Sequence, residues 1–198
     1  MKMAPISPLI NRYTKWTALD SKQQHRNYLI FTKLDFKMSQ IDVQIASAKR
    51  KIVRLDFGDY VIFAVHAPAF GKGGGETALQ LASMIAAAPP PCIAIGDINI
   101  DLEELHTEIA ENHGVARCAL FDNGTISHFG PAPSGPVVSF NRRWHPARGS
   151  ILKYRPRTQK SGGTLDYVIA RTGAAVTVSI AVAAEQFSDH AAILAEWS

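Results

Sequence analysis

The chain has 198 residues, of which 46% are hydrophobic and 19% charged, and its formal net charge is +4. This length predicts one hydrophobic core and a single domain over residues 1–198, and the composition excludes a disordered chain. The longest apolar stretch, residues 79–95, contains three consecutive prolines and is shorter than the roughly 20 residues that a membrane-spanning helix needs, so no span is expected.

Short β-type runs dominate the first third of the chain. Strands are predicted at residues 28–32, 41–47, 51–57 and 60–66, because each run is rich in β-branched and aromatic residues between polar breaks. The dipeptide Gly58-Asp59 lies between the last two runs and predicts a tight hairpin turn there.

A glycine run and a proline run enclose the first predicted helix. Residues 71–75 read Gly-Lys-Gly-Gly-Gly and are expected to break the chain. The helix is predicted over residues 76–88, with Glu76 near the positive end of the helix dipole. The prolines at 89–91 end it, and a short apolar strand, buried on both faces, is predicted at residues 92–95.

The second half of the chain alternates between loops and strands. A second helix is predicted at residues 102–112, and residues 122–163, dense in Gly, Pro and Ser, read as mostly loop with one strand at 137–141. Three final strands are expected at residues 165–170, 175–183 and 191–197. Many strands with only two helices predict stacked sheets covered by helices, an α/β sandwich.

Polar residues interrupt the apolar pattern at the ends of four predicted strands. They are His66, the run Gly96-Asp97-Ile98-Asn99, Asp166, and the run Ser188-Asp189-His190. Each of them alone is explained by a turn, a helix cap or a buried structural histidine. Together, they are residue types that support hydrolysis of a phosphate ester with the help of a metal ion.

The chemistry divides among these residues. Asp97, Asn99 and Asp189 offer the oxygen ligands that Mg²⁺ or Mn²⁺ prefers. His66 and His190 can transfer protons near neutral pH or donate hydrogen bonds to a reacting phosphate. A carboxylate such as that of Asp166 can orient the second histidine by accepting its other ring N–H.

The positive charge is concentrated in one short segment. Residues 141–160 carry seven Lys/Arg and no Asp/Glu, interleaved with Trp144 and Tyr154, whereas residues 61–140 carry two Lys/Arg against eight Asp/Glu. The segment is either a loop that contacts a polyanion or a solvated surface loop. Its cations are Arg142, Arg143, Arg148, Lys153, Arg155, Arg157 and Lys160.

The order His, Gly-Asp-x-Asn, Leu-Asp-Tyr, Ser-Asp-His resembles the endonuclease/exonuclease/phosphatase superfamily. Residues 158–167 and 57–67 are more narrowly similar to the DNase-like B subunits of cytolethal distending toxins. The resemblance implies a two-sheet β-sandwich flanked by helices, the DNase-like four-layer sandwich. It also implies a Mg²⁺-dependent (or Mn²⁺-dependent) phosphodiesterase.

The resemblance also implies a role for each motif residue. His66 and His190 match the paired catalytic histidines, and Asp166 matches the acid behind the second. The residues that match the family's metal-, phosphate- and water-contacting positions are Asp97, Asn99 and Asp189. Arg50, sixteen residues before His66, matches a phosphate-binding arginine, with Lys49 and Lys51 as register alternatives.

One departure from the family pattern concerns the metal. The family begins with a strand bearing an Asn and a strand bearing a metal-binding Glu, but this chain has no Glu before Glu76, and only Asn11, Asp20 and Asn27 could stand in. The sequence therefore resembles a member shortened at its N-terminus. We expect weakened Mg²⁺ binding and an exposed sheet edge that a protein partner or a dimer would cover.

Three functions follow as hypotheses. The first is a Mg²⁺-dependent DNA endonuclease, with DNA or another phosphate-ester polyanion as partner. The second is a catalytically weak or inactive member that binds nucleic acid or a protein partner, and the third is a phosphoinositide phosphatase with the same site. The chain starts without an export signal, which favours the cytoplasm, or a secreted or delivered toxin whose signal is missing from this sequence. Cys92 and Cys118 allow at most one disulfide.

Overall fold

The computed structural model describes residues 15–19, 28–42, 51–68, 73–89, 91–101, 105, 107, 111, 126–129, 164–171, 174–181, 190 and 192–197. Its elements are β1 (Lys15–Leu19), β2 (Tyr28–Thr32), β3 (Lys37–Asp42), β4 (Lys51–Asp56), β5 (Val61–His66), α2 (Gly73–Ala87), β6 (Cys92–Asp97), β7 (Ile126–Phe129), β8 (Asp166–Arg171), β9 (Val176–Ala181) and β10 (Ala192–Trp197). Residues 105, 107 and 111 are also helical.

The strands form one large sheet and two hairpins. Six strands pair in the order β3-β4-β5-β6-β8-β7, while β1 pairs with β2 and β9 with β10. Neighbours in the large sheet are antiparallel except β5 and β6, which are parallel and follow each other through α2. A parallel pair requires such a crossover, because the chain must return to the same edge before the next strand starts.

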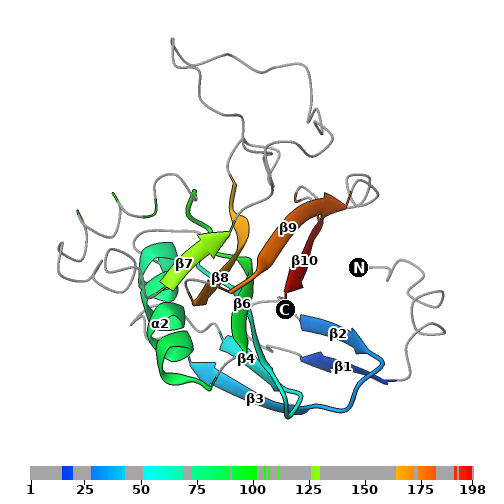
Figure 1. Ribbon diagram of the computed structural model, residues 1–198. Helices are drawn as coiled ribbons and strands as arrows, with labels where there is room; N and C mark the ends of the chain where they lie inside the picture. Colours follow the sequence, from blue (N-terminus) through cyan, green and yellow to red (C-terminus); the bar gives the residue numbers. More distant parts are fainter. Residues whose placement is uncertain are drawn as a thin grey trace.

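Helix α2 and the β9–β10 hairpin cover opposite faces of the large sheet (Figure 1). Val61, Phe63 and Val65 of β5 belong to the larger core cluster, which includes most of the buried side chains of α2. Ile62 of β5 belongs to the smaller cluster with Val178 of β9 and Ile193 of β10. Because successive strand residues face opposite sides, each central strand contributes to both cores, as the predicted sandwich requires.

Most predicted strands are confirmed within one or two residues, and the differences lie at element ends. The strand predicted at 41–47 overlaps β3 only at Ile41 and Asp42, because β3 begins at Lys37, and residues 43–47 lie outside the described residues. β1 and β7 were not predicted; β7 lies within the stretch read as mostly loop. The strand predicted at 137–141 lies outside the described residues, as does most of the helix predicted at 102–112.

The expectation that residues 71–75 break the chain is wrong for the last three glycines. Helix α2 begins at Gly73 and includes Gly74 and Gly75. A side chain at Gly74 would place its Cβ 2.9 Å from the carbonyl oxygen of Ile98 and 2.9 Å from Cβ of Ile100. Glycine is therefore needed here for close packing of the helix start against the loop after β6, not for a turn.

Within the described residues, no helix is both long enough and apolar enough to cross a membrane.

Candidate active site

Three polar side chains lie next to one another where the neighbouring strands β5, β6 and β8 of the large sheet end or begin. His66 pairs in register with Asp97 of β6, and Asp97 pairs with Asp166 of β8. Strand alternation places all three on the face that β9 and β10 cover, since Ile62, Ile95 and Val168, at even spacing from them along their strands, belong to that core. The structure thus brings together residues that are 31 and 69 positions apart in the sequence.

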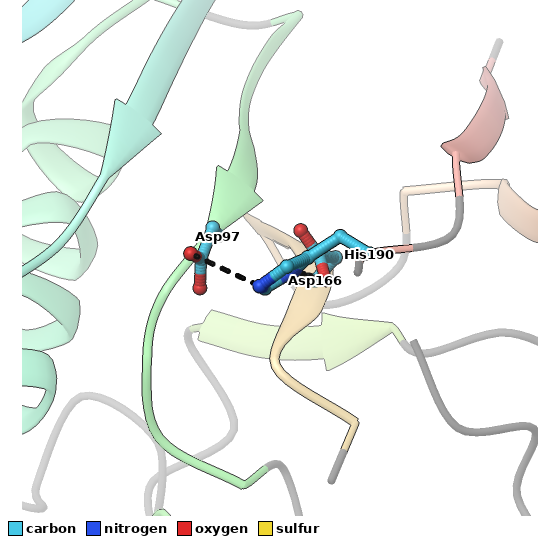
Figure 2. Close-up of side chains that lie close together, drawn as sticks. All are labelled: Asp97, Asp166 and His190. Carbon is cyan, nitrogen blue, oxygen red and sulfur yellow. Dashed lines mark hydrogen bonds and ion pairs between the residues drawn. The ribbon is translucent and has the colours of Figure 1, made fainter. Parts of the chain in front are cut away.

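His190 completes this group from the segment just before β10. Its Nδ1 lies 2.7 Å from Oδ2 of Asp166, and its Nε2 lies 3.9 Å from Oδ2 of Asp97 (Figure 2). An ionised carboxylate only accepts hydrogen bonds, so Nδ1 carries the proton in the bond to Asp166. The neutral ring consequently turns its unprotonated Nε2 toward Asp97, where it can accept a proton.

His66 approaches Asp97 from the other side. Nε2 of His66 lies 3.4 Å from Oδ2 of Asp97, and its side chain is 39% exposed, compared with 15% for Asp97. The aspartate therefore stands between two imidazole rings. The side chain of His66 is also more exposed than that of His190, which is 24% exposed. The ring of His66 is therefore accessible to a molecule that approaches from solvent.

A tight turn holds Asp97 and Asn99 in place. Oδ1 of Asp97 accepts the backbone N–H of Asn99 at 2.9 Å, and Nδ2 of Asn99 donates to Oδ2 of Asp97 at 3.0 Å and to the carbonyl oxygen of Ala67 at 2.7 Å. Asn99 has a φ of 56°, in the left-handed region that asparagine tolerates better than most residues. Since the amide nitrogen is used in this way, the amide oxygen of Asn99 is the atom that remains for a ligand.

The site disfavours negative charge on Asp97. Burial and, to a smaller extent, the neighbouring charge of Asp166 raise the pKa of this carboxyl to about 6, while His190 and the hydrogen bonds from Asn99 oppose the rise. Two carboxylates side by side in a half-buried position repel each other. A cation bound between them would relieve this repulsion, so the electrostatics favour a positively charged ligand.

Tyr28 of β2 also reaches the site, although the sequence offered no signal for it. The N–H of Ala67 donates to the carbonyl oxygen of Asp97 in β6. Successive N–H groups of a strand point to opposite sides, so the N–H of His66 points toward β4. The pairing of β4 with β5 has already ended there, at Val53 and Ala64. The Tyr28 hydroxyl accepts that N–H, and burial raises the pKa of Tyr28 to about 12, with the charge of Asp97 contributing to the rise. The phenol therefore stays protonated beside the site.

Asp97, Asp166 and His190 are grouped closely enough to hold a metal ion, with one ligand atom of each within 4.8 Å of the others. The donor set fits a hard divalent cation only in part, because Oδ2 of Asp166 is already bonded to His190. Asp97 remains as a carboxylate ligand. One or two carboxylates with waters and a substrate phosphate are a common Mg²⁺ environment, so the residues present are compatible with Mg²⁺.

Several sequence-predicted site residues lie outside the described residues. They are Asp189, Arg50 and the seven cations Arg142, Arg143, Arg148, Lys153, Arg155, Arg157 and Lys160. Of the register alternatives to Arg50, Lys49 also lies outside, and Lys51 begins β4. Asn11, Asp20 and Asn27, the stand-ins for the family's N-terminal ligands, are outside as well.

The sequence around this site matches a known family over most of the chain. A sequence model described as the endonuclease/exonuclease/phosphatase family matches residues 26–190, a range that includes His66, Asp97, Asp166 and His190. The chain belongs to this family. A search of curated protein sequences found no match.

Solved structures of the same fold support the assignment of this family member to the DNase-like α/β sandwich. CdtB, described as the biologically active subunit of cytolethal distending toxin, aligns with a TM-score of 0.58 and 16% identity over 90% of this chain and 64% of CdtB. A truncated TDP2 from Caenorhabditis elegans aligns with a TM-score of 0.52 and 13% identity over 97% and 79%. An AP endonuclease from Archaeoglobus fulgidus aligns with a TM-score of 0.53 and 13% identity over 92% and 79%.

The chain thus spans 64% of the length of CdtB. At these identities the likeness concerns the fold; one of the three neighbours is described as an AP endonuclease. The general assignment to a hydrolase fold with a candidate metal-binding group follows from the family match and from the Asp97, Asp166 and His190 group.

Proposed function

We propose that this protein hydrolyses phosphodiester bonds in DNA with the help of Mg²⁺ or Mn²⁺. The observation that carries the proposal is the 2.7 Å contact between Asp166 and His190, with the other ring nitrogen of His190 directed at Asp97. This is the arrangement of an oriented general base next to a carboxylate that attracts a cation. A purely structural histidine would not need a half-buried second carboxylate on its far side.

The geometry supports the following proton path. Nε2 of His190 accepts a proton from the attacking water, and the carboxylate of Asp166 stabilises the resulting imidazolium through Nδ1–H. The water oxygen forms the new bond to phosphorus as the bond from phosphorus to the leaving oxygen breaks. His66, the more exposed ring, donates a proton to the leaving oxygen or a hydrogen bond to the phosphate.

The metal site is proposed at Asp97, with the amide oxygen of Asn99 and the carboxylate of Asp189 as further ligands. A bound Mg²⁺ would supply charge stabilisation for the phosphate oxygens in the transition state. The raised pKa of Asp97 supports this placement, because a cation restores the ionised form that burial disfavours. The cation-rich segment 141–160 supports a polyanionic substrate such as DNA.

The test is a Mg²⁺ titration of plasmid nicking by the wild type, His190→Ala and Asp166→Asn. An asparagine at 166 can donate to Nδ1 and so move the ring proton to Nε2, which removes the base. We therefore expect both variants to lose at least about 100-fold in kcat. Asp59→Asn is the matched control, because Asp59 is an exposed residue of the turn at the opposite end of β5.

The outcomes separate the alternatives. Supercoiled plasmid left intact by the wild type across a wide range of protein and Mg²⁺ concentrations contradicts the nuclease proposal. Salt-sensitive DNA binding without cleavage would then support a binding module. Phosphate release from a phosphoinositide panel, abolished by the same two variants, would support a lipid phosphatase instead.

A further inference from the structure

The loop after β6 is packed against the start of α2 and the end of β5. Ile98 is fully buried and Ile100 is 8% exposed, and both approach Gly74 at the start of α2. The side chain of Asn99 bonds to the carbonyl oxygen of Ala67, just past the end of β5. The loop is therefore held by α2 and by β5 before it reaches Asp101.

The same loop binds the start of β8 through two hydrogen bonds. The N–H of Ile98 donates to the carbonyl oxygen of Leu165 at 2.8 Å, and the N–H of Thr164 donates to Oδ2 of Asp101 at 3.1 Å. They continue the contact between β6 and β8 beyond the last strand pair, Asp97 and Asp166. In the second bond, a side-chain carboxylate takes the place that a backbone carbonyl has in a sheet.

Removing the bond between the Thr164 N–H and Asp101 is expected to destabilise the start of β8. Thr164 is 4% exposed, so its N–H would be left without solvent if the carboxylate were removed. A buried donor without a partner is expected to pull the backbone toward another acceptor. Thr164 precedes Asp166 by two residues, and Asp166 holds the ring of His190.

We propose that Asp101 is a positioning residue that joins the two halves of the site. Asp97 ends β6 and Asn99 lies on the loop that follows it, and the carboxylate of Asp101 fixes the start of β8 so that Asp166 meets Nδ1 of His190. The inference deepens the proposed function and rests on it for its kinetic consequence. Its structural consequence, the orientation of His190, does not depend on activity.

The consequence for catalysis follows from the short path between the Asp101–Thr164 bond and the base. A movement of about 1 Å at a reacting group can cost up to about 100-fold in rate. If the start of β8 shifts, Asp166 no longer selects the ring proton position of His190. We expect kcat to fall while KM changes little, because the substitution acts through the orientation of His190 and leaves in place the phosphate and metal contacts proposed for His66, Asp97 and Asn99.

The experiment compares Asp101→Asn with Asp101→Leu, which have nearly the same shape as aspartate. Asparagine keeps an oxygen that can accept the Thr164 N–H, whereas leucine has none. Asp59→Asn and Asp59→Leu are the matched controls at the exposed turn. The readouts are the low-field proton resonance of Nδ1–H in His190, assigned by its loss in His190→Ala, and kcat and KM for plasmid nicking.

We expect the resonance and kcat to be preserved in Asp101→Asn and in both controls. In Asp101→Leu, the resonance should broaden or disappear and kcat should fall about tenfold or more, with KM within about twofold of the wild type. If Asp101→Leu does not fold, Asp101→Ala replaces it, with the same change expected in the resonance, kcat and KM. The inference is overturned if the leucine variant keeps the resonance, or if the asparagine variant loses it.

The resonance also separates this inference from the proposed function. If the wild type shows the resonance but cleaves no DNA, the nuclease proposal fails, and the effect of Asp101→Leu on the resonance still decides the role of Asp101.

Discussion

Asp97 serves two requirements that oppose each other. Its carboxylate must be ionised to bind a cation, but it is half-buried beside Asp166, and its pKa is raised to about 6 from 3.8. The folded protein therefore binds this proton more tightly than the unfolded chain. Between about pH 4 and pH 6, the free energy of unfolding decreases as the pH rises, and above that window the folded state carries the full cost of the ionised group.

We predict that Asp97→Asn is more stable than the wild type above pH 6 in the absence of divalent metal. The difference should be on the order of 2 kcal/mol at pH 7.5 and should shrink toward pH 4, where the side chain at position 97 is neutral in the folded state of both proteins. Urea unfolding at several pH values in a chelating buffer measures it. A difference between the two proteins that does not change with pH would contradict the assignment.

At the scale of the element, α2 ends without a basic residue of its own in its last turn. Arg171 of β8 provides the charge from another strand: its guanidinium donates to the carbonyl oxygens of Ile85 at 3.3 Å, Ala86 at 2.9 Å and Ala88 at 2.6 Å. These carbonyls have no partner within the helix. The strand that carries Asp166 thus also holds the helix that packs behind it.

We predict that Arg171→Ala lowers the free energy of unfolding by about 2 kcal/mol, because the variant cannot make the charged hydrogen bonds to the helix-end carbonyls. Arg171→Lys should restore part of it, since a lysine offers charge but not the planar fork. Denaturant unfolding measures both. Arg54→Ala, which removes a partly exposed ion pair with Asp56, is the control and should cost about 1 kcal/mol or less.

The β1–β2 hairpin reaches the site through Tyr28 of β2. Removing the hydroxyl in Tyr28→Phe leaves the N–H of His66 without its acceptor. We expect a decrease of about 1 kcal/mol in stability and faster hydrogen exchange at the His66 amide. Tyr60→Phe, at the opposite end of β5, is the control; equal exchange rates in the two variants would argue against the contact.

At the scale of the whole molecule, the charge is divided between an acidic site and a basic segment. The site gathers Asp97 and Asp166, and residues 141–160 carry seven cations. An acidic site alone would repel DNA, so the proposed DNA binding would have to come from cations elsewhere. The net charge of +4 does not reveal this division, because it sums the acidic and the basic residues of the whole chain.

We predict that DNA affinity falls steeply with salt and that replacing Arg142, Arg143 and Arg148 with Ala flattens the dependence. Removing one cation that binds a DNA phosphate should reduce the slope of log K against log salt by about 0.9. Fluorescence anisotropy with a short duplex at several salt concentrations measures the slope. Arg54→Ala is the control, and an unchanged slope in the triple variant would show that these three arginines do not contact DNA phosphates.

The order of most of the elements and the position of the polar residues within them could be predicted from the sequence, whereas β1 and β7 could not. His66, Asp97 and Asp166 stand out because each interrupts an apolar run at a strand end, and the apolar runs of β5 and β6 predict both strands from the local pattern. The start of α2 could not be predicted in this way. A glycine run favours a loop by propensity, but tertiary packing against Ile98 and Ile100 overrides propensity at Gly74.

The sequence by itself determined the fold class and the residue types of the site, because strand patterns and strand-end motifs are local. The family resemblance already implied the pairing of Asp166 with His190, which lie 24 positions apart. Only the tertiary structure decided the contact of Tyr28 with His66 and the bond from Thr164 to Asp101, which join residues 38 and 63 positions apart. Such contacts depend on strand register and on the return of the chain through α2, and no local pattern encodes either of them.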